Sequence, residues 1–244
     1  MLPVRSSIIW STVSSESAPL SLDGIPVTVR VSPRARRMRL RVDTRTRSVL
    51  LTVPRRVSQR RALAWAATHR DWLEATLAAI PDRAPILPGS TVPLFGMPRR
   101  IHWDVARPRR IEVETDRLLV GGPVEGLESR ILRWLRAEAL DLLRRETAEF
   151  AARAGVSVVR VGVGDPASRW GSCSSSGAIR YSWRLVMAPD FVRRATVAHE
   201  VAHLVHLDHS PRFHALVEQL LGEDPRPARL WLRRQGATLH RIGR

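Results

Sequence analysis

Residues 191–207 read FVRRATVAHEVAHLVHL, and the interpretation of the whole chain starts from this stretch. It contains no Gly or Pro, and its apolar residues recur at helical spacing, which predicts a largely buried helix of about 17 residues, roughly 25 Å long. Pro189 and Asp190 suit its first turn, because proline lacks the N–H that stays unpaired there and a carboxylate meets the positive end of the helix dipole. The histidines of this core helix therefore need an explanation.

Within this helix, His199, Glu200 and His203 form the pentapeptide H-E-V-A-H. Residues four apart lie on one helix face, about 6 Å apart along the axis, so the two imidazoles can bind one metal ion. Zinc favours nitrogen ligands, and in hydrolases it keeps one position open for water or substrate. Glu200 can then accept a proton from that water. Five of the eight histidines fall within residues 199–214, which favours a metal site over histidines packed in a core.

A zinc hydrolase needs a third protein ligand, and helix geometry limits the choice. His206 lies about 10.5 Å along the axis from His199, too far for a rigid helix to bring it to the same ion. His209 is followed by a serine and a proline that start a second helix, SPRFHALVEQLL, so it lies in a connection that can fold back. Glu218 in that second helix is the alternative ligand, while His206 and His214 are interpreted as packing or supporting residues.

The stretch 168–221, SRWGSCSSSGAIRYSWRLVMAPDFVRRATVAHEVAHLVHLDHSPRFHALVEQLL, resembles the YgjP-like metal-dependent hydrolases, a metallopeptidase family distantly similar to SprT-like zinc proteases. The likeness extends weakly over most of residues 25–240. Asp208 stands where the family often has Asn, which could alter hydrogen bonds around the ligands. The resemblance implies one zinc ion per chain and Glu200 as the catalytic base. It implies three metal ligands: His199, His203 and His209.

The segment SRWGSC, residues 168–173, reads as a loop before a strand over 178–186. One interpretation makes it a wall of the active-site cleft, where Arg169 and Trp170 contact the substrate or a developing oxyanion. The other packs Trp170 in the core and pairs Arg169 with a carboxylate. Cys173 is the only cysteine, which excludes an intrachain disulfide, and we interpret it as a small buried residue.

The charge of the chain is strongly positive. Its 244 residues carry a formal net charge of +17, and every one of the 40 basic residues is arginine. Residues 25–70 hold 13 arginines against one acid, Asp43. Such a segment attracts polyanions, so nucleic-acid binding through 25–70 is one prediction, and a solvated arginine-biased surface is the alternative. With no apolar stretch of the ~18–20 residues that a membrane helix requires, no export signal and a single cysteine, we expect no membrane partner and a cytoplasmic location.

The remaining periodicity predicts an α+β fold. Strands are expected at 27–31, 38–42, 49–53, 92–95, 101–105, 111–113, 118–120 and 156–163. Helices are expected over 58–77, with Ser58 as its cap, over 127–153, and around Trp231. We expect a loosely ordered tail over 1–24 and one domain over 25–240 that has two lobes. The first lobe, 25–125, is β-rich and arginine-rich. The second, 126–240, is zincin-like, with a small sheet that backs the metal helix.

The function predicted from the sequence is that of a zinc-dependent hydrolase, and specifically an intracellular metallopeptidase that uses a metal-activated water with Glu200 as general base. A peptide or protein substrate would add to a strand edge within 178–186. One alternative is a metal-dependent nucleoside-triphosphate pyrophosphatase, although the chain has no P-loop and no cluster of carboxylates for magnesium. The other is a nucleic-acid-associated protein whose structural zinc site is completed by Glu218 or His214.

Overall fold

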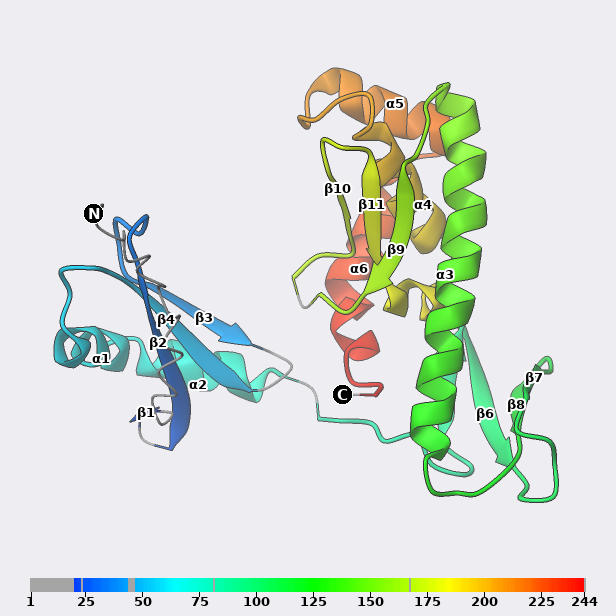
Figure 1. Cartoon of the computed structure of the whole chain (residues 1–244), viewed down its shortest axis with the longest axis horizontal. Coiled ribbons are helices and arrows are strands. Elements are labelled where there is room, and N and C mark those ends of the chain that lie inside the picture. The colour runs from blue at the N-terminus through cyan, green and yellow to red at the C-terminus, as the bar shows by residue number, and fades with distance from the viewer. Residues whose placement is uncertain (1–19, 23, 44–46, 81, 167, 244) are drawn as a thin grey trace, which may run out of the picture. The chain divides into compact units, whose positions relative to one another are not determined.

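The computed structural model describes residues 20–22, 24–43, 47–80, 82–166 and 168–243, and the chain divides into two units by its internal contacts, Met1–Ala78 and Ala79–Arg244 (Figure 1). The division falls earlier than the boundary at 125 expected from the sequence. The reason is that the strands between residues 91 and 120 pack in the core of the second unit. Most of the expected tail lies outside the described residues, but Leu20–Leu22 forms a strand.

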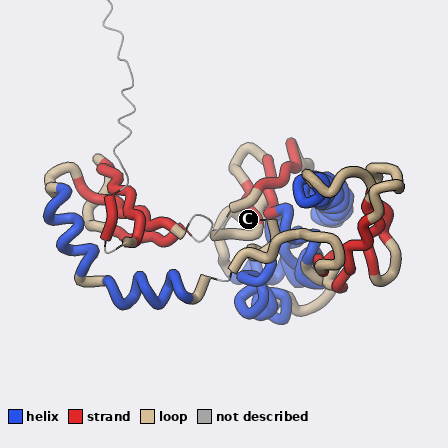
Figure 2. Tube along the Cα trace, turned by 90° about the horizontal axis from the view of Figure 1, so that it is seen from below, coloured by secondary structure: helices blue, strands red, loops and turns tan. Residues whose placement is uncertain are grey.

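The first unit is a four-stranded sheet with two helices. Its strands pair in the order β1-β2-β4-β3, with β2 and β4 parallel and the other pairs antiparallel. Alternate residues of the central strand, Val49, Leu51 and Val53, are buried against the helices, which lie on one side of the sheet (Figure 2). The bounds are β1 Leu20–Leu22, β2 Ile25–Ser32, β3 Arg39–Asp43, β4 Ser48–Pro54, α1 Gln59–Ala67 and α2 Arg70–Ala78.

The single helix expected over 58–77 is two helices. Ser58 caps α1 by accepting a hydrogen bond from the backbone N–H of Arg61, which confirms the expected start. Thr68 then ends α1, because its hydroxyl donates to the carbonyl of Trp65 at 2.7 Å and competes with the next helical turn. The connection between β3 and β4 lies largely outside the described residues.

The second unit has two small sheets and a long helix around one core. The first sheet pairs in the order β5-β6-β8-β7 and the second in the order β10-β11-β9. The bounds are β5 Thr91–Leu94, β6 Met97–Trp103, β7 Ile111–Val113, β8 Arg117–Val120, α3 Leu127–Ala154, β9 Arg160–Gly164, β10 Gly171–Cys173, β11 Ala178–Ser182, η1 Trp183–Met187, α4 Asp190–Ala202, α5 Pro211–Leu221 and α6 Arg226–Leu239. The long helix α3 packs against α4, η1 and β9. The fold is therefore mixed α+β, as expected.

Three local predictions in the second unit are wrong. The strand expected over 178–186 ends at Ser182, whose hydroxyl accepts the N–H of Arg184 and starts the 3-10 turn η1. The segment read as a loop contains β10, because it pairs antiparallel with β11. The 17-residue helix is α4, which ends at Ala202 where the chain tightens into a turn.

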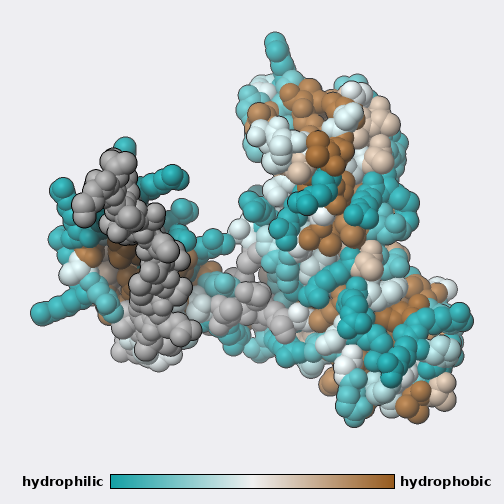
Figure 3. All heavy atoms as spheres, in the orientation of Figure 1, coloured by the Kyte–Doolittle hydropathy of each residue, from teal (hydrophilic) through white to brown (hydrophobic). Residues whose placement is uncertain are grey.

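The surface of the second unit is largely hydrophilic on the face shown in Figure 3, with smaller hydrophobic areas between the polar side chains. No described helix combines the length and the apolar character needed to cross a membrane.

A buried arginine ties the end of the chain to the core of the second unit. Arg184 in η1 is 1% exposed and donates to the Asp165 carboxylate at 2.7 and 3.0 Å. It also donates to the carbonyls of Leu239 and Ile242 at 2.6 and 2.7 Å. Burial raises the pKa of the Asp165 carboxyl, but the hydrogen bonds and charge of Arg184 outweigh burial, so this pKa lies below its ordinary value.

Asp165→Asn is expected to lower the free energy of unfolding near neutral pH by about 1–2 kcal/mol, a value discounted for solvent because the Asp165 side chain is 29% exposed. A carboxyl whose pKa is depressed by folding stabilises the fold above its unfolded pKa of about 3.9, and this contribution is lost as the pH falls through the folded pKa. Denaturant titrations at several pH values should show the difference between variant and wild type shrinking below about pH 4. A difference independent of pH would contradict the prediction.

Candidate metal centre

Helix α4 and the turn after it carry the three histidines of the site. His199 lies in the last turn of α4, and His203 is its C-cap residue, with its N–H bonded to the His199 carbonyl at 3.3 Å. The chain then turns back towards α4 before α5 begins. Asp208 holds this connection by accepting the N–H of Ser210 at 3.2 Å, and the connection places His209 beside α4.

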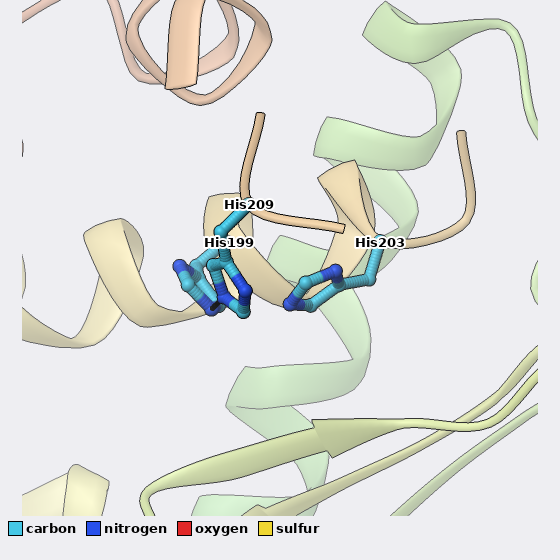
Figure 4. Close-up of side chains that lie close together, drawn as sticks. All are labelled: His199, His203 and His209. Carbon is cyan, nitrogen blue, oxygen red and sulfur yellow. Dashed lines mark hydrogen bonds between the residues drawn. The ribbon is translucent and has the colours of Figure 1, made fainter. Parts of the chain in front are cut away.

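The three imidazoles face one another, as Figure 4 shows. Each offers one nitrogen, and these nitrogens all lie within 4.8 Å of one another. The Nε2 atoms of His209 and His199 are 3.4 Å apart. Ligand nitrogens about 2.0–2.1 Å from a tetrahedral zinc ion lie about 3.3 Å from each other, so the pair already has that spacing. The cluster could therefore hold a metal ion.

A backbone hydrogen bond fixes the tautomer of His203. Its Nδ1 lies 3.0 Å from the carbonyl oxygen of His206, and since a carbonyl only accepts, Nδ1 carries the proton. Nε2 is then left with a free lone pair, which is the usual arrangement of a metal-binding histidine. His206 thus supports the site through its main chain, and its side chain is not a member of the cluster.

His199 is neutral at physiological pH. Burial, followed by the neighbouring charges of His203, His209 and Arg229, lowers its pKa to about 4. A neutral imidazole can donate a lone pair to a metal, whereas an imidazolium cannot. Two imidazole nitrogens 3.4 Å apart either form a hydrogen bond or face a common ion, and the convergence of His203 on the same point favours the ion.

Phe213 packs against all three imidazole rings and is not among the site residues expected from the sequence. It lies in the first turn of α5, is fully buried, and its ring centroid is 4.5–4.9 Å from those of the three histidines. Ser210 caps this turn by accepting the N–H of Phe213 at 3.4 Å. The sequence signal for Phe213 is its helical spacing from the apolar Val217 and Leu220. All three residues are buried on the inner face of α5.

Glu200 is buried beside the histidines and faces β10. Burial raises the pKa of its carboxyl to about 7, against the opposing effect of the Arg169 charge. Gly171 makes room for this carboxyl: a Cβ atom at that position would lie 2.4 Å from Glu200 Oε1. A carboxyl that titrates near neutral pH can both accept and return a proton. The site thus combines three convergent imidazoles with a candidate acid–base group.

A model of the YgjP-like metallopeptidase domain matches residues 36–235 of the chain. The chain belongs to the YgjP-like family. The family assignment and the histidine cluster together identify it as a metal-dependent hydrolase. No curated protein and no solved structure shows a significant match.

A cavity of about 260 Å³ lies next to the histidine cluster of this YgjP-like domain, and Arg169, Trp170, His199 and Glu200 all border it. Trp170 also packs on α6, where Gly236 leaves space for its ring: a Cβ there would lie 2.7 Å from the indole. Trp170 is therefore both a packing residue and a cavity wall. Arg169 is exposed and forms no ion pair within the described part of the chain, so the expected pairing with a carboxylate is not seen.

The other candidate residues of the YgjP-like domain lie outside the cluster. Glu218 is exposed on α5 and is not grouped with the histidines. His214 borders the cavity, and its ring centroid is 6.3 Å from that of His209. Cys173 is half-buried in β10, and burial together with the Glu200 charge raises the pKa of its thiol, which works against a reactive thiolate.

Proposed function

We propose that this YgjP-like protein is a zinc-dependent peptidase, with Glu200 as its general base and the zinc ion held by three histidines: His199, His203 and His209. The observation that carries the proposal is the buried Glu200 carboxyl beside three imidazoles that converge on one point. Nitrogen ligands in this number are those of a zinc site that keeps a position open for chemistry. We also propose that the second unit is zincin-like, with the metal helix α4 beside an edge strand.

The residues of the chain supply the proton transfers. A bound zinc ion would acidify a water molecule and polarise the scissile carbonyl. Glu200 accepts the proton of the water and returns it to the leaving amine, and its pKa of about 7 suits both steps. Arg169 borders the same cavity, where its charge would stabilise negative charge on the substrate.

The edge strand β10 is suited to bind the substrate backbone. The peptide-binding edge expected within 178–186 is not available, because β11 is paired on both sides and has no free edge. Just before β10, the carbonyl of Trp170 accepts a hydrogen bond from the N–H of Ser182, and just after it the N–H of Ser174 donates to the carbonyl of Ala178. The backbone groups of Gly171 and Cys173 therefore point away from β11. An extended peptide that adds to this edge would pass directly beside Glu200.

His209→Ala is expected to remove most of the bound zinc, because it deletes one of three protein ligands. Removing a residue that only hydrogen-bonds to a metal ligand typically weakens metal binding by about 10–100-fold, so removing a ligand itself should weaken it more. Metal content per chain, measured by mass spectrometry after zinc loading, should fall from near one in the wild type to a small fraction. His214→Ala, a neighbouring histidine outside the cluster, is the matched control and should keep its zinc. Unchanged zinc in His209→Ala would move the third ligand elsewhere.

Product analysis tests the reaction itself. Zinc-loaded protein is incubated with a peptide library and, separately, with nucleoside triphosphates, and the products are identified by mass spectrometry. We expect cleaved peptides and intact nucleotides. Release of pyrophosphate from nucleotides without peptide cleavage would overturn the peptidase proposal and support the pyrophosphatase alternative.

The first unit supports a second function, the binding of nucleic acid. In the register of its sheet, Arg30 and Arg39 flank Thr52 on the two neighbouring strands, and Arg41 lies beside Leu50 in the next row. These positions alternate with the buried ones, so the three arginines lie on the face opposite the helices, and all three are exposed. We propose that this arginine face contacts phosphates of a polyanion.

Single-stranded nucleic acid should bind the full chain with an affinity that falls steeply with salt. Each phosphate contact contributes about 0.7 to the slope of log affinity against log salt. Replacing the arginine face with Gln at all three positions should reduce this slope by up to about 2. A control with the same charge change replaces exposed arginines beside α1, namely Arg55, Arg56 and Arg60. Binding that is insensitive to salt, or equally weakened in both variants, would contradict a role for this face.

A further inference from the structure

The cavity beside Glu200 has apolar walls contributed by three helices. Its volume of about 260 Å³ exceeds the roughly 150 Å³ that holds a benzene ring in an engineered protein cavity, so it can take a side chain of leucine or phenylalanine size. Pocket walls of this kind select apolar groups of a ligand. The apolar walls include Ala195 of α4, Val217 of α5, and Ala228 and Leu232 of α6.

Two arginines border the same cavity from different elements. Arg169 precedes β10 and Arg229 lies on α6, and both are exposed. Neither forms an ion pair within 4.0 Å to any residue in the described ranges. Asp224 is the acid that feels the Arg229 charge, but its carboxylate is bonded to Arg226 at 2.7 Å. Neither guanidinium group at the cavity is therefore held in an ion pair by the described part of the chain.

The two arginines border the same cavity as His199 and Glu200, the reactive groups of the site. Arg229 also borders an adjoining depression along α6, which shares Trp170 with the cavity and adds Arg233 and the Arg226–Asp224 ion pair. A ligand in the cavity thus meets both apolar side chains and guanidinium groups. Arginine binds carboxylates with charge-assisted, often bidentate, hydrogen bonds.

We propose that the cavity binds an apolar side chain of the substrate while Arg169 and Arg229 bind a carboxylate next to it. The preferred substrate is then a peptide whose apolar residue is at the chain terminus and carries the free carboxylate, or is adjacent to an acidic residue. This inference rests on the proposed peptidase function, and it names the substrate class for the same site. Because both sources of carboxylate present the same chemistry to the arginines, the test includes one probe for each.

Binding of small probes, measured by calorimetry on the zinc-loaded full chain, tests the site without turnover. Acetyl-leucine supplies a terminal carboxylate, and acetyl-leucinamide supplies no carboxylate. The α-amide of acetyl-leucyl-aspartic acid, with both backbone ends blocked, supplies only a side-chain carboxylate. At least one acid should bind on the order of tenfold more tightly than the amide. Acetyl-glycine should bind more weakly than acetyl-leucine, since it leaves the apolar walls uncovered. Equal binding of acids and amide, or of the glycine and leucine probes, would overturn the proposal.

Arg229→Glu should abolish the preference for the acids. Arg234→Glu is the matched control, because it makes the same charge change at an exposed position of the same helix that does not border the cavity. Equal loss of the preference in both variants would overturn the proposal. The preference for the acids over the amide should persist in His209→Ala. If it is lost in His209→Ala and kept in Arg229→Glu, the carboxylate binds the metal and not the arginines. If the protein cleaves peptides but shows none of these binding preferences, the proposed binding site is wrong and the peptidase function stands. If it shows the preferences but cleaves no peptide, the peptidase function is wrong and the binding site stands.

Discussion

Glu200→Gln is expected to reduce the rate of peptide hydrolysis by on the order of 10²–10⁴-fold while leaving the zinc content unchanged. Glutamine has nearly the shape of glutamate and fits the same space beneath Gly171, but it cannot accept a proton from water. Glu200 is outside the group of convergent histidines, so its replacement removes no ligand. The measurement is kcat/KM on a cleaved peptide, together with metal content per chain.

Glu218→Gln is the matched control for this experiment. It makes the same chemical change at an exposed carboxylate of α5, the residue that the sequence left as an alternative ligand. Its activity and zinc content should both equal those of the wild type. Full activity in Glu200→Gln, or loss of activity in Glu218→Gln, would contradict the assignment of the base.

The prediction of the histidine cluster was possible because the spacing of its ligands is local. His199 and His203 are four residues apart on one helix, and His209 follows a short turn, so helix geometry alone limits where their side chains can lie. The groups that complete the site come from farther along the chain. Gly171 meets Glu200 only because β10 pairs with β11 and lies against α4, which no local pattern indicates.

The same distinction applies to the fold. The 28-residue helix α3 could be predicted almost to its last residue, because its apolar positions keep helical spacing over its whole length. The boundary between the two units could not be predicted in this way. The strands near Val49 and those near Ile101 have similar apolar patterns, and only their packing shows that the first belong with α1 and α2 and the second with α3. Which core a strand joins depends on contacts between distant residues.

The interior of the second unit also contains an ion pair whose loss should be strongly destabilising. Arg193 in α4 donates to the Glu146 carboxylate of α3 at 2.9 and 3.1 Å, and the two side chains are 4% and 7% exposed. Glu146→Ala leaves the guanidinium of Arg193 buried with only the exposed carboxylate of Asp190 as a partner. We therefore expect the free energy of unfolding, measured by denaturant titration, to fall by about 3–5 kcal/mol.

Two further variants test whether the loss of stability comes from burial of the pair or simply from removing a charge. Asp141→Ala removes a carboxylate from the same helix, but its pair with Arg145 is exposed, so the free energy of unfolding should change little. Glu146→Leu combined with Arg193→Met removes both buried charges and should recover most of the stability lost in Glu146→Ala, because the cost arises from one charge left without its partner. If the double variant were as unstable as the single one, the helices would depend on the ion pair itself. Recovery would instead show that the loss in Glu146→Ala comes from the unpaired Arg193 charge, and that the packing of α4 against α3 does not require the ion pair.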